Sequence, residues 1–437
     1  MSINHVLEIL RRWGFWILDF AKGSSIRNHY NEIRQILENP NSSKAEELRK
    51  NNLQKILKHA ISTTPFYLDY VNCKSLEDFP VINKNMILNR YDQFKSEKFL
   101  RSKLHKASSS GSTGIPFSIL QNVAKKTRNT ADTIYYGHIV NNLIGNKLYY
   151  LKLWSSKNYK SKWSLFAQNI VVHNIMDSSD KDIAALLKRI QKDSSNKTIL
   201  GYPSFFALIC NYIDHHGYSA KELRIKSIIS FAESLSEDVQ IKISKYFGTQ
   251  VYARYSNQEN GIIAQQTKNS KNKYLLNWAS YFIEILEIDS DNHVPSGGLG
   301  RVVVTDLFNY AMPMIRYDTG DMAIYEETDY GYPVLSKIYG RRADMIYNTK
   351  GEIVLPMIFY RILDYSKASQ FQFIQKNKYD YVFKLNAKIE DTKENEARQF
   401  FYDYLGNDAN IDFEYVVEIP VLSSGKRKEV SNLYIQK

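Results

Sequence analysis

The densest run of small polar residues in the chain lies between residues 107 and 116. It reads Ala-Ser-Ser-Ser-Gly-Ser-Thr-Gly-Ile-Pro, and its glycines stand at positions 111 and 114. Glycine leaves the backbone free to turn its N–H groups toward a polyanion, and the hydroxyls add further donors. Such a loop could hold a triphosphate. It lacks the lysine of a Walker loop and the spacing of a dinucleotide-binding turn, so a polar hairpin fits the pattern equally well.

Two further stretches place a carboxylate where a strand or turn ends. Residues 252–261 follow a short apolar segment and contain Tyr255 and Glu259. The ring could stack on a base and the carboxylate could bind a metal, or both could lie on an ordinary strand exit. Residues 314–321 end at Asp321, which could accept hydrogen bonds from two ribose hydroxyls or simply cap its turn.

Two basic turns follow nearer the C-terminus. The first, Gly-Arg-Arg-Ala-Asp at 340–344, carries two guanidinium groups that could bind phosphate or form ion pairs between domains. The second, Pro-Val-Leu-Ser-Ser-Gly-Lys at 420–426, presents one lysine on a glycine-containing turn. Taken alone, that lysine is expected to be an exposed surface residue.

The elements that must position these residues alternate along the chain. Strands are expected at 148–153, 169–173, 226–232, 250–254, 281–288 and 300–305, and helices at 43–61, 122–143, 180–192, 203–213 and 235–246. Alternation of this kind indicates an α/β fold with a mainly parallel sheet, later joined by a β-rich part. Strands at 369–375, 379–386 and 411–418 with a helix at 390–405 indicate a small α+β domain. We expect a large domain over 1–340 and a small one over 341–437.

Residues 1–45 are expected to form a helical extension. Within it, residues 6–21 place apolar side chains at helical spacing, with Arg11, Arg12 and Lys22 alongside. A helix docked on the protein is the favoured interpretation, and an anchor lying on a membrane surface is the alternative. No basic region of a signal peptide begins the chain, and no window reaches the ~18 apolar residues of a membrane span.

Composition narrows the class of protein. The 437 residues include 58 Lys and Arg against 46 Asp and Glu, a net charge of +12, which favours anionic ligands. These charges are scattered and form no stripe interleaved with aromatic residues, so a nucleic-acid partner is not expected. Cys73 and Cys210 stand far apart, which excludes a disulfide framework and a cysteine zinc site. Two isolated thiols suit the cytoplasm, where the protein could be peripheral to the inner membrane face.

In this order, the five stretches resemble the motifs of the adenylate-forming superfamily, which includes acyl-CoA synthetases. Residues 109–116 look like its phosphate loop, 255–259 like its Y-G-x-[ST]-E element and 317–321 like its [YF]-R-T-G-D element. Gly340-Arg341 resembles the start of its hinge, and 424–426 its C-terminal lysine turn.

Within that superfamily the chain is most similar to the phenylacetate–CoA ligase family, including its relatives in capsule and O-antigen gene clusters. The opening segment around TTPFY, the Pro116-Phe117 end of the phosphate loop and the A-x-P-x-I-R-Y pattern at 311–317 carry this resemblance. It extends from about residue 45 to the end of the chain.

The resemblance implies a role for each matching residue. Tyr255 would stack on adenine, Glu259 would bind Mg²⁺, Asp321 would bind the ribose and Lys426 would act on the α-phosphate and carboxylate. Glu233 would line the adenine and acyl pocket. The resemblance also implies ATP binding by Arg341 and by the loop residues Ser109, Ser110, Gly111, Ser112, Thr113 and Gly114.

The chain departs from the family pattern at four positions. Ser256 and Gln258 replace a usual Gly and Ser or Thr, which affects the geometry around the metal. Asp318 stands where Arg or Lys is common. Ala343 replaces the first residue of an Asp-Asp hinge, of which Asp344 remains.

The implied function is ATP-dependent activation of a small carboxylic acid as acyl-AMP, followed by transfer to a thiol, amine or hydroxyl acceptor. The expected pathway is decoration of cell-surface polysaccharide, with ATP and Mg²⁺ as cofactors and CoA as a candidate acceptor. The alternatives are a catabolic aryl- or acyl-CoA ligase, and a non-catalytic nucleotide-binding scaffold of a membrane-associated assembly.

Overall fold

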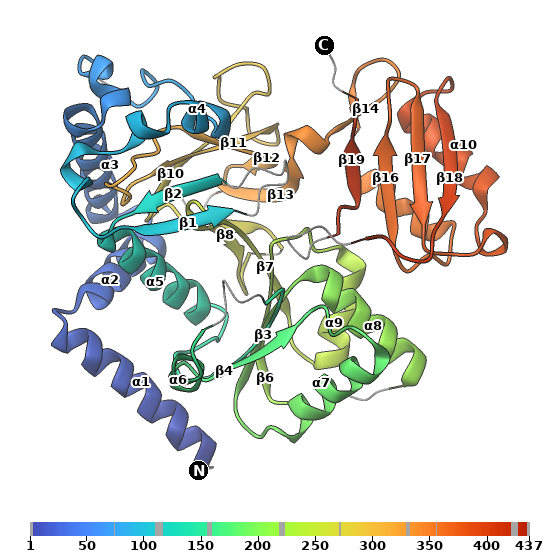
Figure 1. The fold of residues 1–437 in the computed structure, drawn as a ribbon, viewed down its shortest axis with the longest axis horizontal. Coiled ribbons are helices and arrows are strands. Elements are labelled where there is room, and N and C mark those ends of the chain that lie inside the picture. The colour runs from blue at the N-terminus through green and yellow to red at the C-terminus, as the bar shows by residue number, and fades with distance from the viewer. Residues whose placement is uncertain are drawn as a thin grey trace. The chain divides into compact units, whose positions relative to one another are not determined.

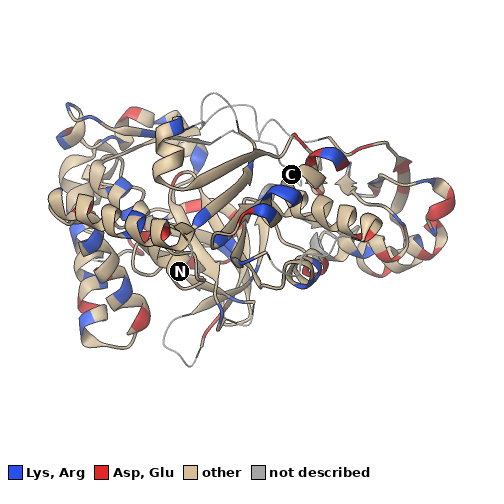
Figure 2. Cartoon of the chain, turned by 90° about the horizontal axis from the view of Figure 1, so that it is seen from below, with Lys and Arg blue, Asp and Glu red and all other residues tan. Residues whose placement is uncertain are grey.

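A computed structural model describes residues 3–73, 75–109, 117–154, 160–217, 223–270, 272–328, 333–354, 356–420 and 427–434. The chain divides into two compact units (Figure 1). The first comprises Met1–Thr319 and Ala323–Ile338, and the second comprises Gly320–Met322 and Tyr339–Lys437. Lys and Arg are spread over both units and interleaved with Asp and Glu, as the sequence predicted (Figure 2).

The first unit begins with three helices, α1 (Ile3–Ala21), α2 (Ser25–Glu38) and α3 (Ser43–Thr63). The Asp19 carboxylate accepts hydrogen bonds from the Ile26 and Arg27 amides at 3.0 and 2.9 Å, so the end of α1 caps the start of α2. Within the described residues, no helix is sufficiently long and apolar to cross a bilayer.

An 11-stranded sheet forms the centre of the first unit, in the order β10-β11-β12-β13-β9-β8-β7-β6-β5-β3-β4. The strands β3 to β7 pair in parallel, and antiparallel pairing begins between β7 and β8. The parallel strands are β3 (Lys147–Lys152), β4 (Ile170–Asn174), β5 (Lys197–Gly201), β6 (Ile225–Phe231) and β7 (Val251–Asn257). The others are β8 (Gly261–Gln266), β9 (Tyr274–Leu276), β10 (Tyr281–Leu286), β11 (Leu299–Asp306), β12 (Tyr317–Glu326) and β13 (Val334–Arg341).

Helices cover this sheet because both partners present apolar faces. The parallel strands pack against α7 (Asp180–Lys192), α8 (Pro203–His216) and α9 (Glu237–Phe247), which share one buried cluster with them. On the antiparallel part, α2 and α5 (Val123–His138) share a second cluster with β8, β10 and β11. The expected α/β fold with a parallel sheet and a β-rich part is therefore confirmed.

A separate hairpin joins β1 (His105–Ser109) to β2 (Phe117–Gln121). Its register pairs Ser109 with Phe117, so the predicted phosphate loop connects two directly opposed strand ends. Residues 110–116 of that loop lie outside the described residues. Two short helices complete the unit, α4 (Lys84–Asn89) and α6 (Lys162–Ala167).

The second unit contains a four-stranded sheet in the order β18-β17-β16-β19, covered by α10 (Glu394–Leu405). Its strands are β16 (Phe371–Gln375), β17 (Asp380–Leu385), β18 (Asn410–Tyr415) and β19 (Val430–Asn432). A small ribbon of β14 (Ile346–Tyr347) and β15 (Ile353–Val354) precedes it. Phenylalanine rings fill the core, with Phe359 stacked on Phe373 at 3.8 Å between centroids.

Candidate active site

Tyr255, near the carboxyl end of β7, contacts the segment that was predicted to bind ribose. Its hydroxyl lies 3.3 Å from the Thr319 hydroxyl on β12. Thr319 donates its own proton to the carbonyl of Val302 at 2.9 Å, so Tyr255 is the donor in the first contact. The hydrogen bond orients a half-buried aromatic ring at the edge of the sheet.

Glu259 lies on the turn that follows β7 and meets the phosphate-loop hairpin. The Gln121 amide, at the end of β2, donates to the Glu259 carbonyl at 2.9 Å. The side chain of Asn257 accepts from the Asn260 amide at 2.7 Å, and the Tyr281 hydroxyl donates to the Asn260 carbonyl. These contacts fix the backbone from which the Glu259 carboxylate projects.

The same hairpin packs on the start of β12. The rings of Phe117 and Tyr317 are nearly parallel, with centroids 6.3 Å apart. Both side chains are buried. Together with the Tyr255 and Glu259 contacts, this packing brings the phosphate-loop hairpin, the aromatic-carboxylate stretch and the start of the 317–321 segment into one region of the first unit.

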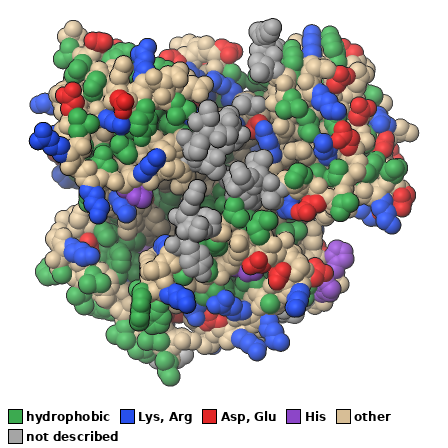
Figure 3. Space-filling model, in the orientation of Figure 1, with side chains coloured by type: hydrophobic (Ala, Val, Ile, Leu, Met, Phe, Trp, Pro, Cys, Tyr) green, Lys and Arg blue, Asp and Glu red, His purple; other side chains and the backbone are tan. Residues whose placement is uncertain are grey.

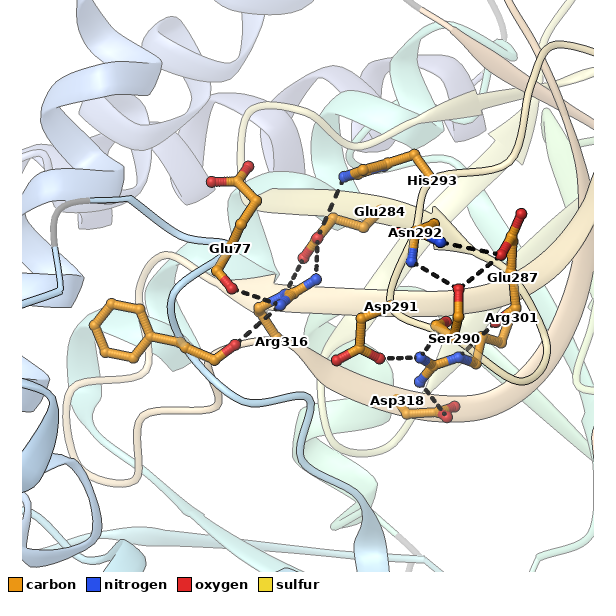
Figure 4. A network of polar contacts seen from close by, with 11 residues as sticks. Glu77, Glu284, Glu287, Ser290, Asp291, Asn292, His293, Arg301, Arg316 and Asp318 are labelled. Atoms are coloured by element: carbon orange, nitrogen blue, oxygen red, sulfur yellow. Dashed lines mark hydrogen bonds and ion pairs between the residues drawn. The ribbon is translucent and has the colours of Figure 1, made fainter.

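A buried arginine holds the start of β12 (Figure 4). The Arg316 backbone has φ of 52°, a left-handed conformation that is costly for a residue with a side chain. Its guanidinium donates to both carboxylate oxygens of Glu284 at 2.9 and 3.2 Å. It also donates to the carbonyls of Glu77 and Phe79 at 3.1 and 2.9 Å. Sequence reasoning did not assign Arg316 a role; the signal was Glu284, an acidic residue inside the apolar run FIEIL.

Asp318, one of the departures from the family pattern, has a buried partner. The Arg301 guanidinium lies 3.3 Å from the Asp318 carboxylate and also donates to Asp291 and to the carbonyls of Glu287 and Ser290 (Figure 4). The charge at position 318 is therefore balanced by a strand β11 residue. Asp321 lies two residues beyond Thr319 on β12 and is half-buried.

Glu233 follows β6, after Ala232 with φ of 73°. Its carboxylate accepts a hydrogen bond at 3.0 Å from the Ser204 amide in the first turn of α8, where the helix dipole favours a negative charge. The preceding Phe231 ring lies 5.0 Å from Tyr202 and 5.8 Å from Tyr150, centroid to centroid. This aromatic group lies at the carboxyl ends of β3, β5 and β6, and sequence reasoning did not identify it.

Arg341 ends β13 in the second unit and is exposed, directly after Gly340 with φ of 76°. Glycine tolerates this left-handed conformation at the end of the strand. Asp344 pairs with Lys428 at 2.6 Å inside the same unit. The side chain of Ala343 lies outside the described residues.

Lys426 and residues 421–425 also lie outside the described residues. The Arg427 side chain donates to the carbonyl of Ile419 at 3.0 Å. Lys428 then enters the edge of the small sheet, where its carbonyl accepts from Gln372 at 2.8 Å.

The carboxylates near the candidate site limit the kind of metal that it could hold. Within the described residues, no group of three or more His, Cys, Asp or Glu side chains could hold a metal ion. Magnesium in nucleotide sites is bound by one or two carboxylates together with substrate phosphates and water. A single carboxylate at Glu259 therefore fits Mg²⁺ carried in with a nucleotide.

Comparison with known proteins gives distant relatives over most of the chain. No family model matches. Protein CapK of Staphylococcus aureus is 22% identical, with 94% of both chains covered. A phenylacetate-coenzyme A ligase of Pseudomonas putida is 24% identical over 73% of this chain and 76% of its own.

Solved structures of acyl-CoA ligases share the fold. A 2-hydroxyisobutyryl-CoA ligase in its postadenylation state, in complex with an acyl-AMP, superimposes with a TM-score of 0.70. The two are 17% identical, and the match covers 91% of this chain and 90% of the ligase. The ordered motifs, the fold and the sequence relatives agree, and the chain is similar to adenylate-forming ligases of the phenylacetate–CoA ligase-like family.

Proposed function

We propose that the protein activates a small carboxylic acid with ATP, forming acyl-AMP and pyrophosphate, and then transfers the acyl group to a thiol, amine or hydroxyl. The observation that carries this proposal is the meeting of the phosphate-loop hairpin with Tyr255, Glu259 and the start of β12. It rests on the Tyr255–Thr319, Gln121–Glu259 and Phe117–Tyr317 contacts.

In the first step a carboxylate oxygen attacks the α-phosphorus and the bond to pyrophosphate breaks. Negative charge builds on the non-bridging oxygens, so preorganised positive charge and N–H donors lower the barrier. We assign the N–H and hydroxyl donors to residues 109–114, the magnesium-binding carboxylate to Glu259 and the cation that acts on the α-phosphate to Lys426. Magnesium, when bound, neutralises phosphate charge.

Residues other than those that stabilise the transition state would bind ATP in the ground state. Tyr255, oriented by Thr319, would stack on adenine, and Asp321 would accept from the ribose hydroxyls. Glu233 already accepts from a helix amide, so its role would be to shape the wall next to Phe231 rather than to bind the ligand as a free carboxylate. Arg341 would contact ribose or phosphate.

Acyl-AMP hydrolyses readily, so the intermediate needs protection from water. We assign residues 1–340 to ATP and acid binding and 341–437 to a lid that brings Lys426 to the reaction centre. In the second step the acceptor attacks the acyl carbon, AMP leaves and the acceptor proton passes to solvent. CoA is one such acceptor.

The similarity to CapK over nearly the whole chain supports a role in cell-surface polysaccharide biosynthesis, where the acyl group would decorate a sugar. The similarity to a phenylacetate-coenzyme A ligase keeps a catabolic aryl-CoA ligase as the second candidate. The two candidates differ in acceptor, and the same assay separates them.

The test is pyrophosphate release with a panel of amino, hydroxy and aryl acids, with and without CoA. Hydroxylamine traps acyl-AMP as a hydroxamate, and mass spectrometry detects an acyl-CoA thioester. We expect acid-dependent pyrophosphate release, reduced about a hundredfold by Glu259→Gln. Glu47→Gln, at an exposed position of α3, is the matched control and should leave the rate unchanged.

Two outcomes would contradict the proposal. A folded protein that binds no ATP at millimolar concentration would reject the nucleotide site. Binding of ATP with no pyrophosphate release for any acid would favour the scaffold alternative. An acyl-CoA thioester formed only from aryl acids would support the catabolic ligase.

A further inference from the structure

Helix α1 turns polar side chains toward the body of the first unit. The buried Glu8 carboxylate accepts from the backbone and side-chain amides of Asn196 at 2.8 and 2.7 Å. The Arg12 side chain donates to the carbonyl of Ile144 at 3.0 Å, and buried Asp19 caps α2. The helix is therefore held largely by hydrogen bonds rather than by an apolar stripe facing the core.

A glycine brings the backbone of α1 against the protein. Gly145 has φ of 93°, and a Cβ added there would lie 2.2 Å from the Glu8 carbonyl oxygen. No residue with a side chain could occupy this position without displacing the helix. The orientation of α1 is thus fixed by specific contacts on its polar side.

The opposite side of α1 is apolar and exposed. Leu10, Trp13 and Ile17, on adjacent turns, are 60%, 65% and 60% exposed. The other exposed apolar residues of the helix are Ile3, Val6, Leu7, Leu18 and Phe20. A helix on the surface of a soluble protein normally turns its apolar side to the core and its polar side to water. In α1 the apolar side faces outward, so we expect another surface to cover it.

Helix α6 extends the same apolar surface. Trp163 and Phe166 are among the exposed large hydrophobic residues, at 83% and 67%. The Arg11 guanidinium lies 5.3 Å from the Phe166 ring centroid and joins the two helices. Figure 3 shows hydrophobic side chains gathered at the lower left, over α1 and α6. We call the exposed apolar residues of these two helices the α1–α6 face.

The exposed charges that these two helices carry have one sign. Both helices lie within the described residues, and their two acidic residues, Glu8 and Asp19, are buried. Their basic residues are Arg11, Arg12 and Lys162, and exposed Lys22 directly follows α1. A second copy would bring the same positive charges together, whereas an anionic surface would neutralise them.

We propose that the α1–α6 face lies on an anionic lipid membrane. The 19 residues of α1 would rest in the plane of the interface, with leucine and isoleucine in the acyl region. Trp13 and Trp163 would lie near the headgroups, where tryptophan is enriched, and the basic residues would meet lipid phosphates. This surface is separate from the residues assigned to ATP, so attachment would leave the catalytic groups unchanged.

The test is flotation of the full-length protein with vesicles of phosphatidylcholine alone and of phosphatidylcholine mixed with phosphatidylglycerol. We expect binding to the mixed vesicles that weakens at high salt, together with a blue shift of tryptophan emission. The variant carrying Leu10→Gln, Trp13→Gln and Ile17→Gln keeps every charge. It should lose binding by roughly a thousandfold, because each of the three buried apolar side chains contributes about tenfold.

Ile241→Gln, on α9, is the matched control because that side chain is 59% exposed in the same unit. It should bind like the wild type, and equal melting temperatures would show that all variants are folded. Absence of wild-type binding to mixed vesicles would overturn the proposal. Undiminished binding by the triple variant would show adsorption through scattered charges and would also overturn it. A lipid-independent dimer that the triple variant dissociates, without vesicle binding, would assign the face to a second copy.

Discussion

Arg316→Met tests whether the buried ion pair holds the start of β12. The variant keeps an unbranched side chain at a backbone position with φ of 52°, so the backbone cost is similar in both proteins. It removes the bidentate partner of the Glu284 carboxylate, which is fully buried and otherwise has His293 at 3.7 Å. Only the charge and its hydrogen bonds differ, which makes the effect on stability interpretable.

The expected loss of unfolding free energy is large. Removing one partner of a buried pair leaves an uncompensated charge and costs about 3–5 kcal/mol. The variant also leaves the carbonyls of Glu77 and Phe79 without the guanidinium donor. We therefore expect a loss of about 4 kcal/mol, roughly a thousandfold in the folding equilibrium, near neutral pH.

The loss should depend on pH with a definite sign. Burial raises the pKa of Glu284, while the Arg316 guanidinium opposes that rise, so Arg316→Met should raise the pKa further. A carboxyl with a raised pKa in the folded state costs nothing while both states are protonated. The cost grows as pH increases from the unfolded-state pKa to the folded-state pKa, and it is constant above that. Arg316→Met should therefore be less destabilised at about pH 5 than at about pH 7.

A double variant separates the effect of the ion pair on unfolding free energy from its effect on the position of the start of β12. Arg316→Met with Glu284→Leu removes both charges and should regain at least half of the lost stability, measured by urea unfolding. Both variants should bind ATP more weakly than the wild type in calorimetry, because the bonds that hold the start of β12 to the carbonyls of Glu77 and Phe79 are absent from both. A single variant as stable as the wild type, or a double variant less stable than the single, would refute the reasoning.

Asp321→Ala should weaken ATP binding more than Lys426→Ala does, because a ribose contact acts in the ground state; equal losses in calorimetry would reject this division. Lys426→Ala should lower ATP–pyrophosphate exchange by about a hundredfold with an unchanged melting temperature. Lys428→Ala breaks the pair with Asp344 and should lower stability slightly without that loss of rate. Burial and nearby Arg128 lower the pKa of His29 to about 4, so stability should fall as pH drops below about 6.5, and His29→Asn should flatten this dependence in acid titrations.

Elements with strong local signals could be predicted from the sequence. The helix expected at 180–192 matches α7, which begins with a capping box between Ser179 and Asp182. The apolar run at 148–153 matches β3 within one residue. In both cases the signal is contained in the segment itself, as side-chain periodicity or as a capping pair.

Strand β5 was not predicted, for a physical reason. Its five residues, Lys197–Gly201, are too few to show a period, and they begin with a charged side chain. The Lys197 ammonium is buried and donates to the carbonyl of Ser195 at 3.1 Å, a contact that the sequence does not reveal. Parallel pairing with β3 and β6 supplies the stability, and that pairing is non-local.

The residues of the candidate site also differ in whether local sequence information predicts them. The order of the motifs selected Tyr255, Glu259 and the 317–321 segment, because residue types at fixed spacing are local information. The groups that hold them were not predictable, since Arg316 meets Glu284 across 32 residues and the Tyr255 hydroxyl meets Thr319 across 64. Asp318, a departure from the family pattern, is paired with Arg301 on the neighbouring strand.

The N-terminal helix shows what periodicity leaves undetermined. An apolar stripe predicts that α1 has two unlike faces, but it does not say which face meets the protein. Docking was the favoured expectation, and the structure docks α1 through Glu8 and Arg12 instead of through its apolar side. The deciding partner, Asn196, lies 188 residues away from Glu8. Because polar contacts hold the helix, its apolar residues are left for an external surface, and polar substitutions at Leu10 or Ile17 should change binding rather than folding.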